Sequence, residues 1–239
     1  MLDSNRLQQL VHIKTLCFDT IDSTSTYIKE NCLSNDDILV CADNQDKGRG
    51  RRGKEFFSRG GIYFSFLYNY LPNEDISKLT LLVAVAIHKV LTLDYNIDCS
   101  IKWVNDIIYN DKKVAGILCE KIPDRNAIIV GIGMNVNIDV FPIELIDIAT
   151  SLHINNLDKE LFISQIVNQI YTMLKEHTPY MDYYRDNCCV LNKEVFFSDG
   201  TSVIKGIATS IEDDGRLVVK VNNKVYYLNS GEISIRLNH

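Results

Sequence analysis

The sequence predicts an α+β fold followed by a small all-β module. Before about residue 188, β-rich runs alternate with two segments whose apolar residues recur at helical spacing. After about residue 190, strand-like runs are separated by turn signals at roughly 8–12-residue spacing, at residues 198–200, 213–215 and 222–223. We therefore expect two domains, residues 1–188 and residues 189–239.

The first elements are expected in the order strand, helix, strand. Residues 13–18 and 38–42 are short β-rich runs. Residues 23–33 lie between them and begin with serine and threonine, whose hydroxyl groups suit the start of a helix. Residues 44–54 carry three glycines among six charged side chains and show no apolar periodicity, so they are expected to form a loop.

The central part of the chain is expected to form a sheet with a covering helix. A strand is expected at residues 62–70 and a helix at residues 76–93, where six apolar residues recur at helical spacing. A hairpin turn is expected at residues 110–112. Apolar residues between Leu161 and Leu174 predict a second amphipathic helix. Further strands are expected at residues 99–103, 107–109, 114–119 and 127–132.

Composition narrows the class of protein. The 239 residues carry a net charge of −6, which argues against a chain-wide binding surface for nucleic acid. The seven cysteines are scattered without a C-x-x-C pair, and no H-E-x-x-H motif occurs, so a zinc site is not expected. Residues 79–90 are the longest apolar stretch, but they fall short of the roughly 20 residues that span a bilayer. Since no signal peptide opens the chain, we expect a cytoplasmic protein without membrane contact.

Residues 48–53, with the sequence GRGRRG, are the strongest local signal. Glycines allow successive backbone N–H groups to converge on an anion, and arginine offers permanently charged, bidentate contacts to phosphate or carboxylate. Such a loop suits a phosphorylated ligand. The composition is equally compatible with a solvated basic loop or an RNA-contacting patch.

Three further segments carry groups suited to a ligand. Residues 102–106 (KWVND) lead into the hairpin, after which Lys113 begins an apolar strand and can point into a cleft, although pattern alone favours lysines that only make the turn soluble. Residues 22–25 (DSTS) offer hydroxyls and free N–H groups, which also simply cap helices. Residues 131–135 (GIGMN) suit a tight turn or a nucleotide contact.

Together these segments resemble the biotin–protein ligase family, in order and at comparable spacing over nearly the whole chain. The resemblance implies a mixed sheet with flanking helices, as in class II synthetases, followed by an SH3-like β-barrel. Residues 231–234 (GEIS) resemble the end of that small barrel. The segments that carry the resemblance are residues 22–24, Gln45 with residues 48–53, and residues 102–106, 113–118 and 131–135.

The resemblance implies a role for each matched residue. Lys113 and Arg51 are expected to be catalytic. ATP is expected to contact Lys102, Trp103, Asn105 and Asn135. No protein-built metal site is expected, because Mg²⁺ would arrive bound to ATP. Biotin or its adenylate is expected to contact Ser23, Thr24, Ser25, Gln45, Gly48, Arg49, Gly50, Arg51, Lys113 and Gly116.

By the same resemblance, the protein is expected to activate biotin with ATP as biotinyl-5′-AMP and to transfer biotin to a lysine of a biotin carboxyl carrier protein. Val104 replaces the proline that usually follows the tryptophan in the family. The expected first strand begins near residue 13, so the N-terminal DNA-binding domain of repressing members is not expected, nor is DNA binding. The sequence is compatible with either a monomer or a homodimer. The alternatives are a lipoate–protein ligase, a nucleic-acid-binding module using residues 49–54, and a non-catalytic biotin sensor.

Overall fold

A computed structural model describes residues 2–32, 37–69, 75–123, 125–198 and 202–229, together with the backbone of residues 236–237. The helices are α1 (Ser4–Val11), α2 (Thr24–Asn31), α3 (Ile76–Lys89), α4 (Lys159–Lys175) and α5 (Met181–Asp186), with the short helical turns η1 (Arg51–Gly53), η2 (Val90–Asp94) and η3 (Ile143–Leu145). The strands are β1 (Lys14–Ile21), β2 (Ile38–Gln45), β3 (Arg59–Asn69), β4 (Ser100–Lys102), β5 (Asp106–Tyr109), β6 (Lys112–Lys121), β7 (Ala127–Met134), β8 (Glu194–Ser198), β9 (Val203–Ile211), β10 (Leu217–Val221), β11 (Lys224–Leu228) and β12 (Arg236–Leu237).

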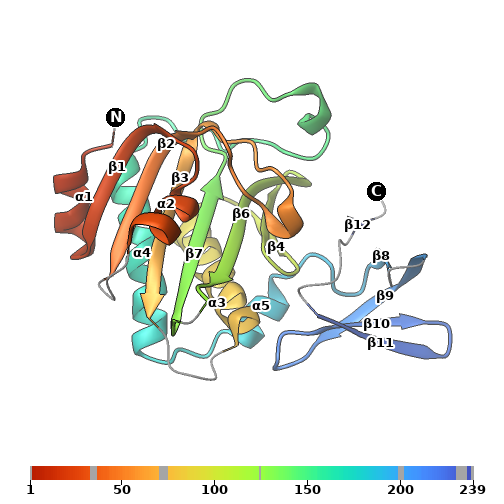
Figure 1. The fold of residues 1–239 in the computed structure, drawn as a ribbon. Helices are drawn as coiled ribbons and strands as arrows, with labels where there is room; N and C mark the ends of the chain where they lie inside the picture. Colours follow the sequence, from red (N-terminus) through yellow and green to blue (C-terminus); the bar gives the residue numbers. More distant parts are fainter. Residues whose placement is uncertain are drawn as a thin grey trace.

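A seven-stranded mixed sheet forms the larger part of the molecule (Figure 1). Its strand order is β1-β2-β3-β7-β6-β5-β4, in which β1 and β2 are parallel and every other neighbouring pair is antiparallel. The parallel pair is connected through α2, as a parallel connection requires a crossover. The predicted α+β class and mixed sheet are confirmed, and so is the hairpin between β5 and β6.

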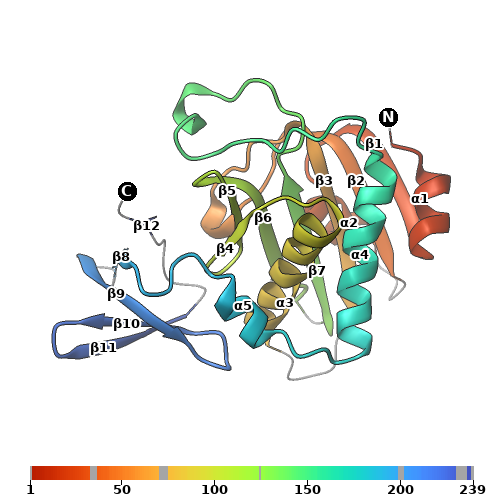
Figure 2. The same cartoon turned by 180° about the vertical axis from the view of Figure 1, so that it is seen from behind.

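Helices cover both faces of this sheet, because alternate residues of its strands are buried on opposite sides. In β3, Phe64 and Phe66 pack into the main core with α3 and α4, which Figure 2 shows lying across one face. Leu67 packs with Ile28 of α2 on the other face. A sheet buried on both sides explains why β3 is almost continuously apolar.

The scaffold helix predicted at residues 76–93 is α3, which begins after the capping side chain of Asp75 and continues into η2. In the described part of the chain, this stretch, Ile76–Asp94, is the one helical segment long and apolar enough to cross a membrane. However, 67% of its most apolar 18-residue stretch is buried inside the fold. Its apolarity therefore reflects its place between the sheet and α4.

Two short helices were not predicted from the sequence. Asp3 caps α1 by accepting hydrogen bonds from the backbone N–H groups of Asn5 and Arg6, and Leu7 and Val11 are its buried residues. The other helix, α5, has six residues. Both are too short for a periodicity that is read over windows of roughly 11–18 residues. Parts of three predicted features, at residues 33, 70 and 199–200, and the whole segment at residues 231–234 lie outside the described residues.

The second sheet has the order β11-β10-β9-β8-β12 and is antiparallel throughout, which confirms the predicted β-rich C-terminal part. Its turn between β9 and β10 touches the larger part of the molecule. The Trp103 indole Nε1–H donates to the Gly215 carbonyl at 3.0 Å, and Arg185 Nε donates to the Ile211 carbonyl at 2.8 Å. The Trp103–Val104 peptide bond, next to this contact, is cis.

Candidate active site

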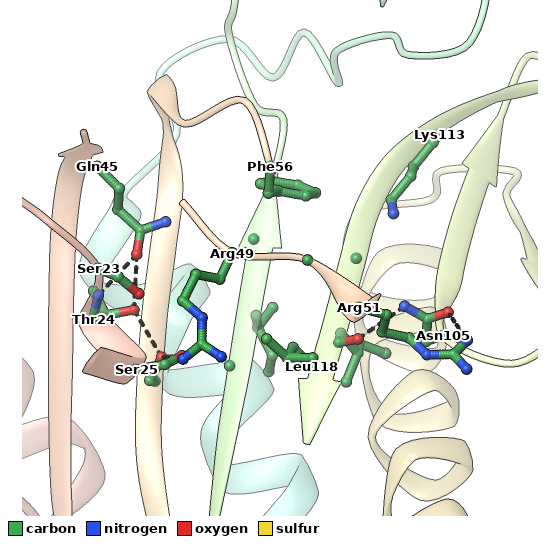
Figure 3. A pocket seen from close by; sticks show the side chains of 17 residues that line it. Ser23, Thr24, Ser25, Gln45, Arg49, Arg51, Phe56, Asn105, Lys113 and Leu118 are labelled. Atoms are coloured by element: carbon green, nitrogen blue, oxygen red, sulfur yellow. Dashed lines mark hydrogen bonds between the residues drawn. The ribbon is translucent and has the colours of Figure 1, made fainter. Parts of the chain in front are cut away.

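A cavity opens on the α2 side of the large sheet, where the loop after β2 crosses over β7 and β6 (Figure 3). It brings together segments that lie far apart in the sequence, because β3, β7 and β6 are neighbours in the sheet. Ten of its lining residues were predicted from the sequence: Ser23, Thr24, Ser25, Gln45, Arg49, Gly50, Arg51, Asn105, Lys113 and Gly116. Seven others line it as well: Phe56, Ser65, Ile117, Leu118, Gly131, Ile132 and Gly133.

One end of the cavity is uncharged and buried, and we call Thr24, Ser25, Gln45 and Ser65 its hydroxyl end. The Gln45 amide oxygen accepts from the Thr24 backbone N–H at 2.9 Å and from the Thr24 hydroxyl at 3.1 Å. The Ser65 hydroxyl lies 2.7 Å from that of Thr24 and 2.9 Å from that of Ser25. These groups are held by the start of α2, the end of β2 and the middle of β3.

The other end of the cavity is positive, and we call Arg51 and Lys113 its cationic end; the Arg49 side chain lies between the two ends (Figure 3). Arg51 donates to the Asn105 side-chain oxygen at 3.1 Å, and Asn105 in turn donates to the Ile117 carbonyl at 2.9 Å. Burial lowers the pKa of the Arg51 guanidinium, and the nearby Asp106 carboxylate opposes this effect. A guanidinium nevertheless remains charged in proteins.

Lys113 and Arg49 each form an ion pair with a carboxylate. Lys113 Nζ lies 2.6 Å from the Asp106 carboxylate, and Arg49 lies 2.7 Å from Glu120. The Arg49 and Glu120 side chains are 40% and 31% exposed, so solvent screens this pair. The cations are therefore held in place by partners that an anionic ligand can replace.

The aromatic ring of Phe56 lies over the floor of the cavity and was not predicted from the sequence. Glycine at position 133 makes room for the ring, because a Cβ atom there would lie 2.5 Å from it; a Cβ atom on Gly116 would lie 3.1 Å from the ring, a tight contact. Lys113 Nζ lies 5.4 Å from the ring centroid, a cation–π contact. Phe56 thus connects the loop to both central strands of the site.

Four residues predicted to bind ligands do not line the cavity: Gly48, Lys102, Trp103 and Asn135. Gly48 accepts from the Phe56 backbone N–H at 2.9 Å and so closes the loop. Trp103 is buried against the C-terminal sheet. Asn135 is buried and its backbone N–H donates to the Val114 carbonyl at 2.7 Å. Lys102 ends β4 at the edge of the sheet. Their assignment to ligand binding remains a prediction.

Comparison with known proteins identifies the family. The model of the biotin/lipoate A/B protein ligase family matches residues 17–138, and that of the biotin protein ligase C-terminal domain matches residues 190–236. The bifunctional ligase/repressor BirA of Bacillus spizizenii is 32% identical over 235 residues, which cover 91% of this chain and 72% of that protein.

A second curated relative and a solved structure agree with this. The biotin–[acetyl-CoA-carboxylase] ligase of Paracoccus denitrificans is 36% identical over 104 residues, covering 41% of this chain and 43% of that protein. The biotin protein ligase from Aquifex aeolicus in complex with biotin and ATP has a TM-score of 0.84 and 30% identity, covering 94% of this chain and 99% of that one. The chain therefore belongs to the biotin/lipoate A/B protein ligase family, as one of its biotin protein ligases.

Proposed function

We propose that this enzyme joins biotin and ATP to biotinyl-5′-AMP and then transfers the biotinyl group to a specific lysine of a biotin carboxyl carrier protein. The single observation that carries the proposal is the polarity of the cavity, which has hydrogen-bonding, uncharged groups at one end, the cations Arg51 and Lys113 at the other, and Arg49 between them (Figure 3). Biotin has the same polarity, since its ring urea is neutral and its valerate carboxylate is anionic.

The cationic end suits the first reaction. A carboxylate oxygen must attack the α-phosphate of ATP, and pyrophosphate leaves; both reactants are anions that repel each other. Arg51 and Lys113 would neutralise this charge, with Asp106 and Asn105 holding them until the substrates bind. In the second reaction the neutral amine of the acceptor lysine attacks the acyl carbon, and AMP leaves with the electron pair of the broken bond.

The loop that carries Arg49 and Arg51 would protect the mixed anhydride from water. It is held by backbone hydrogen bonds from Gly50 N–H to the Lys54 carbonyl at 2.7 Å and from Phe56 N–H to the Gly48 carbonyl at 2.9 Å. The cavity volume is about 50 Å³, whereas pockets for small molecules hold roughly 300–1,000 Å³. We therefore expect the loop and Phe56 to move outward when the adenylate binds.

Magnesium is part of the proposal only as an ion carried by ATP. Among the described residues, no group of three histidine, cysteine, aspartate or glutamate side chains could hold a metal ion. Asp106 and Glu120 pair with Lys113 and Arg49. We propose that phosphate oxygens of ATP hold the ion.

We also propose that two domains have different roles. Residues 1–188 would form the catalytic domain, and residues 189–239 an SH3-like domain whose β9–β10 turn supports the region around Trp103. The antiparallel order of the second sheet supports this. A cytoplasmic location fits an acceptor that belongs to a biotin-dependent carboxylase.

Mass spectrometry of a purified carrier domain tests the proposal. The domain is incubated with the enzyme, ATP, Mg²⁺ and either biotin or lipoate. We expect the mass of the domain to increase by one biotinyl group, only with ATP present, and not to increase by a lipoyl group. Lipoyl transfer without biotinyl transfer would overturn the proposal in favour of a lipoate–protein ligase.

A further inference from the structure

Ser65 lies at the centre of the hydroxyl end, and the proposed reaction gives it no role. It lies in the middle of β3, is fully buried, and lines the cavity. Its hydroxyl group contacts that of Thr24 on one side and that of Ser25 on the other. Each hydroxyl has a single proton, so the directions of these hydrogen bonds depend on one another.

The Gln45 side chain fixes the first direction. A backbone N–H can only donate, so the amide atom that contacts the Thr24 N–H at 2.9 Å must be the Gln45 oxygen. That oxygen can only accept. The Thr24 hydroxyl, which lies 3.1 Å from the same oxygen, must therefore give its proton to Gln45.

The remaining directions follow from this one. Because the Thr24 proton is used, the 2.7 Å contact with Ser65 requires the Ser65 proton. Because the Ser65 proton is then used, the 2.9 Å contact with Ser25 requires the Ser25 proton. The reverse order would leave Thr24 and Gln45 as two oxygens facing each other without a proton, an unfavourable contact in a buried site.

The same direction continues on the far side of Gln45. The Gln45 Nε2–H donates to the Ser58 hydroxyl at 3.0 Å, and Ser58 donates to the Phe56 carbonyl at 2.9 Å. One ordered series of hydrogen bonds therefore runs from Ser25 through Ser65 to Phe56. It joins the buried end of the cavity to the residue whose ring covers the cavity floor.

We infer that Ser65 is a positioning residue that makes the hydroxyl end specific for a ligand carrying N–H donors. By using the Ser25 proton and supplying its own to Thr24, it leaves both neighbouring oxygens able to accept but unable to donate toward the cavity. The ring urea of biotin offers two N–H donors, whereas the dithiolane ring of lipoate offers none. The inference rests on the proposed function, because it explains how that site tells these substrates apart.

Ser65→Ala tests this role through binding rather than through loss of chemistry. Without Ser65, the Ser25 proton can turn toward the cavity and oppose a ligand N–H. We expect the KM for biotin to rise about tenfold, in the range of one lost neutral hydrogen bond, while kcat and the KM for ATP change less than about twofold, because the cationic end is untouched. The matched control is Ser164→Ala, a similarly buried serine in α4, which should leave the KM for biotin unchanged.

Two biotin analogues separate a positioning role from a purely structural one. Each is a cyclic carbamate in which one ring N–H is replaced by oxygen. In the wild type, at least one analogue should bind about 30-fold or more weakly than biotin, because two acceptors then face each other. In Ser65→Ala the same replacement should weaken binding by a several-fold smaller factor, because the variant and the analogue change the same contact. Isothermal titration measures all of these affinities without turnover.

The outcomes are distinguishable. The role of Ser65 would be overturned by an unchanged KM for biotin in Ser65→Ala. It would also be overturned if the analogue lost the same factor in affinity, relative to biotin, in both proteins. Failure of the wild-type enzyme to use biotin at all would instead overturn the proposed function. If Ser65→Ala does not fold, as judged by circular dichroism, Ser65→Cys serves the same comparison, because a thiol is of similar size but donates only weakly.

Discussion

The two ends of the cavity are built on opposite physical principles. At the hydroxyl end, uncharged groups are buried and hydrogen-bond to one another, so the protein's own contacts hold their geometry. At the cationic end, Lys113 is partly exposed and pairs with Asp106. Arg49, between the two ends, is partly exposed and pairs with Glu120. Ion pairs of this kind are worth only about 0–1 kcal/mol, so substrate anions can replace the carboxylates at little cost.

This difference indicates how binding and chemistry are divided. A buried network that is fully satisfied is costly to disturb, which suits recognition of a fixed head group. Charges that exchange partners suit a reaction in which negative charge moves from a carboxylate to a phosphate. Variants at the cationic end should therefore affect mainly kcat, and variants at the hydroxyl end mainly the KM for biotin.

The largest effect is expected from Lys113→Ala. Removing this charge should lower the rate of adenylate formation by about 10²–10³-fold, as for other groups that stabilise a charged transition state. ATP–pyrophosphate exchange measures this rate. Lys112→Ala is the matched control, because Lys112 lies next to it but donates to the Ile146 carbonyl on the surface. Near-normal exchange by folded Lys113→Ala would show that Lys113 is only a turn residue.

Gln45→Leu should break the hydroxyl end. It leaves the Thr24 backbone N–H without its partner and removes the group that directs the hydroxyl protons. We expect biotin to bind about 10–100-fold more weakly, with the KM for ATP nearly unchanged, as measured by isothermal titration and steady-state kinetics. Gln165→Leu, which removes a partner of Tyr95 far from the cavity, is the control. An equal loss of affinity for both substrates would contradict the division between the two ends.

Arg51→Gly should have a smaller effect on the first reaction and a distinct effect on its product. Without the contact to Asn105, the loop should close less firmly, so biotinyl-AMP escapes and biotin retention weakens several-fold. The freed anhydride would acylate lysines of an unrelated lysine-rich protein. Streptavidin blotting of that bystander detects the reaction.

The control for this prediction is Arg52→Gly. Arg52 is exposed and has a φ of 58°, which glycine adopts readily. The Arg52→Gly enzyme should label the carrier domain and leave the bystander protein unlabelled. Equal labelling of the bystander by the wild type and by Arg51→Gly would contradict a closing role for Arg51.

The smallest effect is expected from Trp103→Phe, because Trp103 does not line the cavity. It removes the hydrogen bond to Gly215 in the C-terminal sheet. We expect a loss of about 1 kcal/mol in the free energy of unfolding, or roughly 2–4 °C in Tm for a chain of this size, with the KM for ATP unchanged. Thermal unfolding and ATP kinetics check this. A rise in the KM for ATP at unchanged stability would favour the role in ATP binding implied by the resemblance.

The sequence by itself determined the elements that have a strong period or a strong local signal. Alternation, helical spacing and turn residues predicted α3, α4, the strands β3, β6 and β7, and the hairpin between β5 and β6. The resemblance carried by residues 48–53 and the other matched segments predicted ten residues that do line one cavity. These features depend on local composition and spacing, which a linear sequence contains.

Only the tertiary structure decided which residues of a buried strand face the site. Ser65 stands among apolar neighbours in β3, a strand buried on both faces, so nothing in its period distinguishes the side that meets α2 from the side that meets α3. Phe56 could equally have been a core residue until the glycines of β6 and β7 were seen to make room for its ring. The directed hydrogen bonds of the hydroxyl end depend on distances between three separate elements, and such distances exist only once the chain has folded.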